Sequence, residues 1–283
     1  MLEPFIQSPL LAEGSVFMLA LCVGSFLNVV VYRLPIMLER RWKQEARAIL
    51  ELPALEEPVF TLAAPRSRCP HCGHYITAVE NIPILSWLAL RGKCSECRKP
   101  ISPRYPLVEL ATALLSVLVL LCLGPTAQTL VAIPLTWALI ALTLIDFDTQ
   151  LLPDDITLPL VWAGLLVNMN GLFVPLPEAL IGAVVGYLSL WSIFWLFKLL
   201  TGKEGMGYGD FKLLAALGAW LGWHQLPLII LLSSVVGVVA GLGYMAVRRQ
   251  NLAFAYGPYL AIAGFIALLQ GQPLMQWYLQ LGH

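Results

Sequence analysis

Long apolar segments separated by short polar breaks make up most of this chain. Eight of them can be distinguished, at residues 14–32, 107–124, 129–145, 156–171, 178–200, 211–223, 226–247 and 257–281. Most come near the roughly 20 residues that an α-helix needs to cross a bilayer. The stretch Gly222 to Pro227 must be a turn, because one helix over residues 211–247 would be far too long. The pattern predicts an all-α polytopic membrane protein with about eight transmembrane helices.

Composition supports a membrane setting. The chain is 59% hydrophobic and only 12% charged, and its mean hydropathy is +0.78. Soluble globular domains usually carry about twice that charged fraction. We therefore expect a lipid bilayer around the chain and no nucleic-acid partner.

The distribution of positive charge predicts the orientation. With the N-terminus outside, the inside segments are 33–106, 146–155, 198–212 and 248–256. All 17 Lys and Arg residues fall in these segments or at their helix edges, and the outside connections hold none. This agrees with the positive-inside rule and with eight spans. Residues 1–13 contain no Lys or Arg, so the first span does not resemble a cleavable signal peptide with its basic start.

Three parts follow from this pattern. Residues 1–33 form the first transmembrane helix, with its N-terminus on the outer side. Residues 34–106 are polar and rich in proline and charge, and predict a small cytoplasmic domain. Residues 107–283 form a seven-helix membrane domain, which contains every aspartate of the chain.

Four of the six cysteines lie in the polar domain, as Cys69-Pro-His-Cys72 and Cys94-Ser-Glu-Cys97, with 21 residues between the pairs. This is zinc-ribbon spacing, in which thiolates from two knuckles close a tetrahedral site. We expect one structural Zn²⁺, because four protein ligands leave no open position for water. Disulfides do not suit the reducing cytoplasmic side, and a thioredoxin-type centre would need a βαβ unit.

The first polar break of the membrane domain holds four of the five aspartates. Asp146 ends a membrane helix on the inner side, and Asp148 lies two residues beyond it. Asp154 and Asp155 follow Pro153 and precede an apolar run, so one of them could instead cap the next helix. Any of the four could supply a carboxyl group for chemistry at this face.

The second polar break reads Gly205-Met-Gly-Tyr-Gly-Asp210 and runs directly into an apolar segment. An ionisable carboxyl at the end of a membrane helix indicates a functional site, and the alternating glycines let another backbone approach. A helix cap is the alternative role for Asp210 as well.

Asp210 and a carboxyl from the first break would make an acid–base pair. When two carboxyls approach closely, one stays protonated while the other is ionised. The ionised group can activate water for attack on a peptide carbonyl, and the neutral group can protonate the leaving amine. This is the arrangement of aspartic proteases.

Several motifs in this order resemble one family, the bacterial type IV prepilin peptidases, also called leader peptidase/N-methyltransferases. Gly207-Tyr-Gly-Asp210 is similar to the Gly-x-Gly-Asp signature of intramembrane aspartic proteases. The other matching stretches are Gly24 to Pro35, the four-cysteine loop, Asn81-Ile-Pro-Ile84, Arg104 to Glu109, Ile145 to Asp154, and Tyr256-Gly-Pro-Tyr259. Together they cover nearly the whole chain.

The resemblance implies a bifunctional enzyme of the bacterial inner membrane. Such an enzyme cleaves the leader from type IV prepilins and type II secretion pseudopilins at the cytoplasmic face. It then methylates the new N-terminal residue with S-adenosyl-L-methionine. The family's catalytic aspartates correspond to Asp146 and Asp210, and the intact cysteine loop corresponds to the methylating form.

Glu109 is an additional candidate, for methyl transfer or for binding the substrate amine. A carboxylate stabilised by the dipole of its helix is the alternative for this residue. The sequence does not indicate which residues bind S-adenosyl-L-methionine, which pilins are cut, or the oligomeric state.

Two other classes of membrane protein remain to be considered. A secondary transporter would place acidic residues near the membrane midplane in two repeated halves, and no such repeat is found. A zinc-dependent hydrolase would need a motif such as His-Glu-x-x-His, which the chain lacks.

Overall fold

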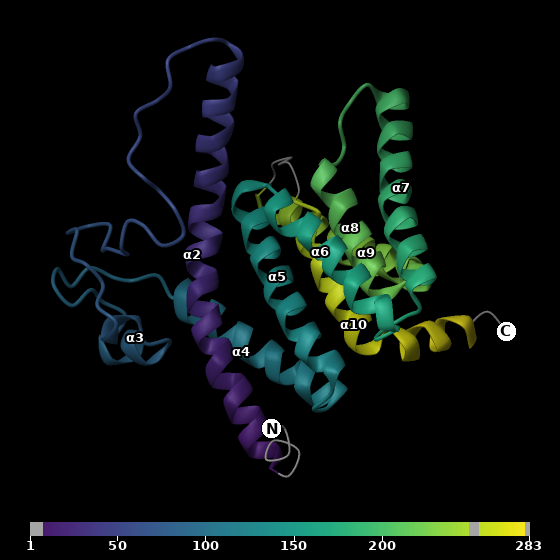
Figure 1. Ribbon diagram of the computed structural model, residues 1–283, viewed down its shortest axis with the longest axis horizontal. Coiled ribbons are helices and arrows are strands. Elements are labelled where there is room, and N and C mark those ends of the chain that lie inside the picture. The colour runs from purple at the N-terminus through teal and green to yellow at the C-terminus, as the bar shows by residue number, and fades with distance from the viewer. Residues whose placement is uncertain (1–7, 249–254, 281–283) are drawn as a thin grey trace. The chain divides into compact units, whose positions relative to one another are not determined.

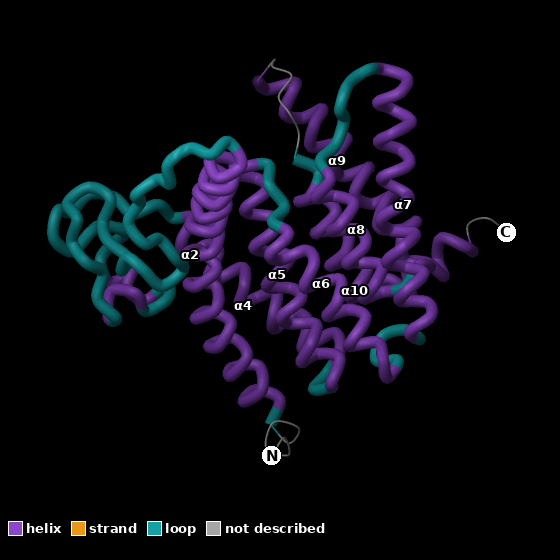
Figure 2. Tube along the Cα trace, turned by 45° about the horizontal axis from the view of Figure 1, so that its top comes forward, coloured by secondary structure: helices purple, strands orange, loops and turns teal. Residues whose placement is uncertain are grey.

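A computed structural model describes residues 8–248 and 255–280 of the chain. A helix overlaps each of the eight expected apolar segments. These helices are α2 (Pro9–Ile49), α4 (Arg104–Leu123), α5 (Ala127–Thr149), α6 (Asp154–Val167), α7 (Leu176–Thr201), α8 (Tyr208–Leu221), α9 (Leu226–Arg248) and α10 (Gly257–Gln280). In the described residues there is no strand, only two isolated β-bridges, so the all-α prediction is confirmed (Figure 2).

Five helical stretches are long and apolar enough to cross a bilayer, judged by length and composition over the described residues. They belong to α2, α4, α5, α7 and α9. Helices α6 and α8 have 14 residues each, which corresponds to about 21 Å of helix. The expected inner connection at 248–256 lies largely outside the described residues.

The chain divides into two compact units, Met1–Leu121 and Cys122–His283. The first contains α2, most of α4, and a loop-rich segment with the short helices η1 (Val79–Asn81) and α3 (Leu85–Ala89). The second contains the helices from α5 to α10, with the short turns η2 (Asn168–Asn170) and η3 (Trp223–Gln225).

In the first unit, α2 is one helix of 41 residues that continues through Pro35. Its C-terminal half holds the segment that returns along it, by bonds from arginine side chains to backbone carbonyls. Arg33 donates to Thr61 O at 2.8 Å and to Pro65 O at 2.7 Å, and Arg47 donates to Pro53 O at 2.8 Å. The loop therefore needs no regular structure of its own to stay in place.

Helices α2 and α4 approach each other closely at Gly24. A Cβ there would lie 2.7 Å from the Cα of Glu109 and 3.1 Å from the side chain of Thr112. Thr112 and Ser116 on this face of α4 are fully buried. Their hydroxyls donate to carbonyls one turn back in the same helix, so the close contact leaves no hydroxyl donor unpaired.

Helix α8 is the centre of the second unit. Every residue from Phe211 to Leu221 is buried except Lys212, which is half-buried. It packs on α7, α6 and α10, which surround it in Figure 1. The α7 contact depends on glycine: a Cβ on Gly182 would collide with the carbonyl of Gly218. Close packing of small residues is how membrane helices associate without a hydrophobic driving force.

A buried amide closes the C-terminal end of α8. Asn168 is fully buried, and its Nδ2 donates to Ala219 O at 2.9 Å and to Trp220 O at 3.0 Å. Its Oδ1 accepts from the backbone N–H groups of Phe173 and Val174. One side chain thus satisfies carbonyls at the end of α8 and amides of the loop that leads to α7.

Substituting Asn168 by Ala should destabilise the second unit, because two buried and two half-buried backbone groups would lose their partner. Each such loss costs about 1–3 kcal/mol before water or relaxation compensates. We expect a clear fall in the thermal unfolding temperature of the protein in detergent. Asn170→Ala, at an exposed position of the same turn, is the matched control and should unfold like the wild type. Equal unfolding temperatures for the two variants would contradict this role.

Candidate functional site

The candidate protease site lies in the second unit, between the end of α5 and the start of α8. Asp146 is in the last turn of α5, which ends where Gln150 adopts a left-handed conformation and donates to Asp146 O at 2.8 Å. Asp210 is in the first turn of α8, after the extended N-cap residue Gly207. Their side chains are 5% and 6% exposed, respectively.

The two carboxyl groups are close enough for the charge of Asp146 to act on Asp210. Both also have an oxygen that is buried and unpaired among the described residues, Oδ2 of Asp146 and Oδ1 of Asp210. Buried polar atoms are rarely left without a partner, and such exceptions point to a catalytic role or to an unseen water.

Three elements meet at this pair through glycines. A Cβ on Gly257, at the start of α10, would lie 2.5 Å from Oδ2 of Asp146 and 3.0 Å from Leu152. A Cβ on Gly209 would lie 2.6 Å from the same leucine. The glycines beside the aspartates therefore permit the close approach that the alternating pattern at 205–210 predicts. The role of Gly257 emerges only from the structure, although its motif was one of the matching stretches.

The other aspartates differ from this pair because they are exposed. Asp154 accepts from Lys212 Nζ at 2.6 and 2.7 Å, an ion pair that ties the start of α6 to the start of α8. Neither Asp154 nor Asp155 is the N-cap of α6, which is Pro153. Asp210 is not an N-cap either. None of the three is therefore the N-cap residue itself, although the carboxylate of Asp210, in the first turn of α8, accepts from the backbone N–H of the N-cap residue Gly207.

The four cysteines of the first unit converge at one point. Their sulfur atoms all lie within 4.8 Å of one another, with Cys69 and Cys97 3.8 Å apart and Cys72 and Cys94 4.0 Å apart. A tetrahedral zinc site with bonds of about 2.3 Å needs sulfur separations of about 3.8 Å. The donor set and its spacing therefore fit a zinc ion.

The two knuckles have the same backbone form. Cys69 N donates to His74 O and Gly73 N to Cys69 O, while Cys94 N donates to Lys99 O and Arg98 N to Cys94 O. Gly73 and Arg98 occupy equivalent left-handed positions, with φ of 77° and 58°. The backbone amides of Cys72 and His71 lower the pKa of the Cys69 thiol to about 6, whereas burial and the neighbouring cysteines raise the pKa of Cys72 to about 11.

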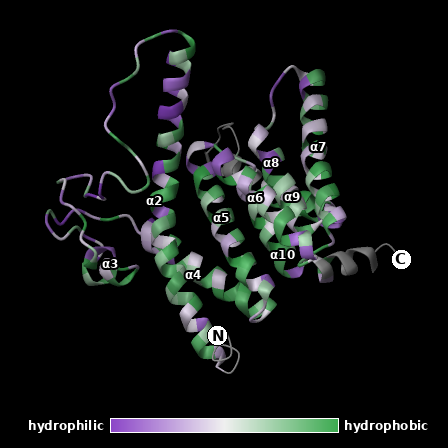
Figure 3. Cartoon of the chain, viewed as in Figure 1, coloured by the Kyte–Doolittle hydropathy of each residue, from purple (hydrophilic) through white to green (hydrophobic). Residues whose placement is uncertain are grey.

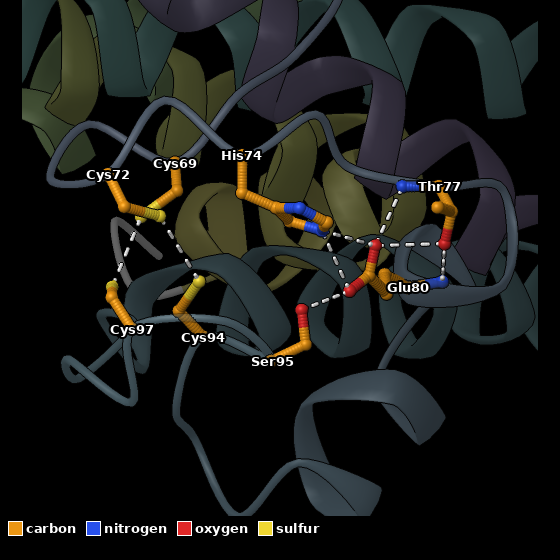
Figure 4. A network of polar contacts seen from close by, with 8 residues as sticks. All are labelled: Cys69, Cys72, His74, Thr77, Glu80, Cys94, Ser95 and Cys97. Carbon is orange, nitrogen blue, oxygen red and sulfur yellow. Dashed lines mark hydrogen bonds and ion pairs between the residues drawn. The ribbon is translucent and has the colours of Figure 1, made fainter.

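Glu80 joins the two knuckles beside the sulfur cluster (Figure 4). Its carboxylate accepts from the hydroxyl of Ser95, from Thr77 N and Oγ1 at 2.8 Å each, and contacts His74 Nε2 at 3.2 Å. Ser95 lies between the cysteines of the second knuckle and His74 follows those of the first. The Ser95 hydroxyl and the Thr77 donors lower the pKa of Glu80 to about 2, so the carboxylate stays charged. The sequence analysis did not single out this residue.

Glu109 lies in the second turn of α4 and is buried. Its Oε2 accepts from the backbone N–H of Ile84 at 2.8 Å, and Ser25 of α2 also bonds its carboxylate. Ile84 has φ of +58°, a strained conformation for a β-branched residue. Glu109 thus joins α2, α4 and the segment before α3, and the structure brings it to neither the cysteines nor any other acidic side chain that it describes.

Comparisons with known proteins agree along the chain. The model of the bacterial peptidase A24 N-terminal domain matches residues 18–123, and that of the type IV leader peptidase family matches residues 133–242. Proteins named prepilin leader peptidase/N-methyltransferase are similar throughout. The one from Aeromonas hydrophila is 60% identical over 96% of this chain and 95% of its own length. Those from Pseudomonas putida and Pseudomonas aeruginosa are 60% and 56% identical, over 93% and 99% of this chain and 92% and 98% of their own. No solved structure matches.

Glu80→Gln should weaken zinc binding, because it removes the charge that holds both knuckles in register. Loss of such an outer partner typically costs about 10- to 100-fold in metal affinity. The measurement is competition for zinc between the purified protein and a coloured chelator. Glu96→Gln, at the exposed position between Cys94 and Cys97, is the control and should retain wild-type affinity.

A Cys72→Ser/Cys97→Ser double variant is the negative control of that experiment, since it should lose the one zinc expected per chain. Wild-type zinc affinity in Glu80→Gln would show that the carboxylate does not organise the site. A native protein that is fully active without zinc would remove the structural role of the metal itself.

Proposed function

This chain belongs to the type IV leader peptidase family, and we propose that it is a bifunctional enzyme, a prepilin leader peptidase and N-methyltransferase. Identity of 56–60% with relatives of that name, over nearly the full length of each chain, carries the assignment. The two family models match successive parts of this chain. The chain also contains both the four expected cysteines and the two expected aspartates. Neither a secondary transporter nor a zinc-dependent hydrolase accounts for this match.

We assign peptide cleavage to Asp146 and Asp210. Two buried carboxyls side by side repel each other when both are charged, so the pair is most stable with a single shared proton. The ionised member can take a proton from water while the water oxygen attacks the scissile carbonyl. The protonated member can donate a hydrogen bond to the carbonyl oxygen. The unpaired, buried carboxyl oxygens support this assignment.

Collapse of the tetrahedral intermediate then breaks the peptide C–N bond. The amine of the mature protein leaves with the proton that was taken from the water, and the leader leaves as a carboxylic acid. The pair has then given up the proton that it took from water and again holds a single proton, so the cycle consumes one water and no other reactant. Both carboxyls are buried beside a helix that is itself buried from Phe211 onward, and electrostatic interactions are stronger in such surroundings than in water.

The second reaction would methylate the amine that cleavage exposes. S-adenosyl-L-methionine supplies an electrophilic methyl group, and the neutral amine attacks it and then loses a proton. We place this activity with the first unit, where the zinc knuckles would act as a structural scaffold. Glu109 is our candidate for the methyl-transfer or substrate-amine site, although its carboxylate already holds Ile84 N–H. No residues are assigned to the methyl donor.

Topology completes the proposal. The enzyme would cross the bacterial inner membrane eight times, with its N-terminus in the periplasm and residues 34–106 in the cytoplasm. Asp146 and Asp210 would then face the cytoplasmic side. Substrates would be prepilins of type IV pili and pseudopilins of type II secretion, whose basic leaders remain in the cytoplasm. The distribution of Lys and Arg supports this orientation.

Asp146→Asn and Asp210→Asn should each reduce leader removal at least about a hundredfold, because an amide cannot exchange the proton. Asp→Glu should also fail, since the added methylene moves the carboxyl by about 1 Å. Cleavage of a prepilin by purified enzyme is the measurement. Asp148→Asn, at an exposed position, is the matched control and should cleave normally. Substantial cleavage by Asp146→Asn would move the assignment to Asp148 or Asp154.

The two activities should separate in the Asp210→Asn enzyme. Methyl transfer needs the free N-terminal amine but no carboxyl pair, so this variant should methylate pilin that has already been cleaved. The measurement is transfer of label from S-adenosyl-L-methionine to mature pilin. A folded variant that transfers no label would mean that both reactions share one site. Wild-type enzyme on the same mature pilin controls for the substrate.

A further inference from the structure

A cluster of exposed apolar side chains lies on η1 and α3 of the first unit. Over η1 and α3, Val79 is 72% exposed, Ile82 43%, Leu85 63% and Leu88 57%. Leu85 and Leu88 are three residues apart and so share one face of α3. The opposite side of the helix is occupied, because Trp87 donates to Ile101 O at 3.2 Å and packs against Gly92. We call Val79, Ile82, Leu85 and Leu88 the apolar face.

The position of the apolar face along α2 shows whether it lies at the level of the bilayer. Ile84, the residue before α3, donates to Glu109, and Glu109 lies against Gly24 and Ser25 of α2. Arg33 marks the end of the apolar stretch of α2. Eight residues of helix separate Ser25 from Arg33, which is about 12 Å. The start of α3 is therefore held level with the membrane-spanning part of α2.

A second hydrogen bond places the start of α4 at the same level along α2. Asn28 Nδ2 donates to Tyr105 O at 3.2 Å, so the start of α4 also lies between Ser25 and Arg33. In the view of Figures 1 and 3, α3 lies at the height of the N-terminal half of α2 and is coloured mostly as hydrophobic, whereas the returning loop lies at the height of the other half.

The charge that follows α3 has the sign that a bilayer surface attracts. Residues 91–104 contain five basic side chains, Arg91, Lys93, Arg98, Lys99 and Arg104, against one acidic side chain, Glu96. Anionic lipid headgroups attract basic residues next to a buried apolar segment. The level of α3 along α2, its exposed apolar side chains and the basic residues that follow it therefore all favour the same partner, a lipid bilayer.

We propose that Val79–Ala89 is an interfacial membrane anchor, whose apolar face enters the acyl boundary of a bilayer containing anionic lipid. Arg91 and Lys93 then lie at the headgroups. The anchor holds the zinc knuckles close to the membrane but on the aqueous side of the headgroups, since the second knuckle begins at Cys94, five residues after α3 ends. This inference does not depend on the proposed function.

The test uses the full chain in nanodiscs that contain phosphatidylglycerol, with p-benzoylphenylalanine in place of Leu88 and, independently, of Leu85. Phe26, 51% exposed on α2, is the membrane reference, and Tyr75, 57% exposed on the first knuckle, is the control outside the membrane. After irradiation, mass spectrometry identifies lipid adducts. We expect adducts at positions 85 and 88 comparable to those at 26, and at least about tenfold above those at 75.

Adducts at Leu85 and Leu88 with another protein segment or with a second copy of the chain would overturn the proposal. So would no adduct there when Phe26 yields one and zinc content shows that the knuckles are folded. The role of the two basic residues is tested separately, in nanodiscs that contain both phosphatidylglycerol and phosphatidylcholine. Arg91→Gln/Lys93→Gln should retain the adducts at Leu88 but lose their preference for phosphatidylglycerol over phosphatidylcholine. An unchanged preference would contradict the role of these two residues.

Discussion

The burial of two neighbouring carboxyl groups is the constraint on which the second unit depends. An isolated charged carboxylate in an apolar interior is costly, and two of them also repel each other. At Asp146 and Asp210 the glycines of two neighbouring segments let the backbones approach, and the side chain of Leu152 packs against both glycines. Gly209 packs on Leu152, and Gly257 packs on both Leu152 and Asp146. A methyl group at Gly209 would collide with Leu152, and one at Gly257 would collide with both Leu152 and Asp146.

The rest of the unit packs closely around that arrangement. Helix α8 is buried along its length from Phe211 onward, apart from the half-buried Lys212, and glycine contacts with α7 let the two backbones approach. At its far end Asn168 satisfies the last carbonyls, and at its near end Lys212 pairs with Asp154. Polar groups are thus paired at both ends of α8, whereas Oδ2 of Asp146 and Oδ1 of Asp210 have no hydrogen-bond partner among the described residues.

The first unit solves a different problem, since its loops bury few apolar side chains. Small loop-rich segments of this kind need a metal or a similar cross-link for stability. Here two matching knuckles bring four sulfurs together, and Glu80 links them through Ser95 and His74. Arginines of α2 hold the returning loop by its carbonyls. Glu109 then fastens the segment before α3 to the helices.

The sequence alone predicted the all-helical class and the convergence of the four cysteines, which the structure confirms, and it proposed the two aspartates; each of these predictions depends on local pattern. Hydrophobic length, Cys-x2-Cys spacing and Gly-x-Gly-Asp can be read from neighbouring residues. It could not establish that Asp210 faces Asp146 across 64 positions, nor exclude the capping roles. Other contacts join segments that are distant in the chain. They are made by Gly257, Lys212, Glu80 and the pair of Glu109 and Ile84. Only packing brings such segments together, because the physical role of each side chain depends on neighbours that its own segment does not contain.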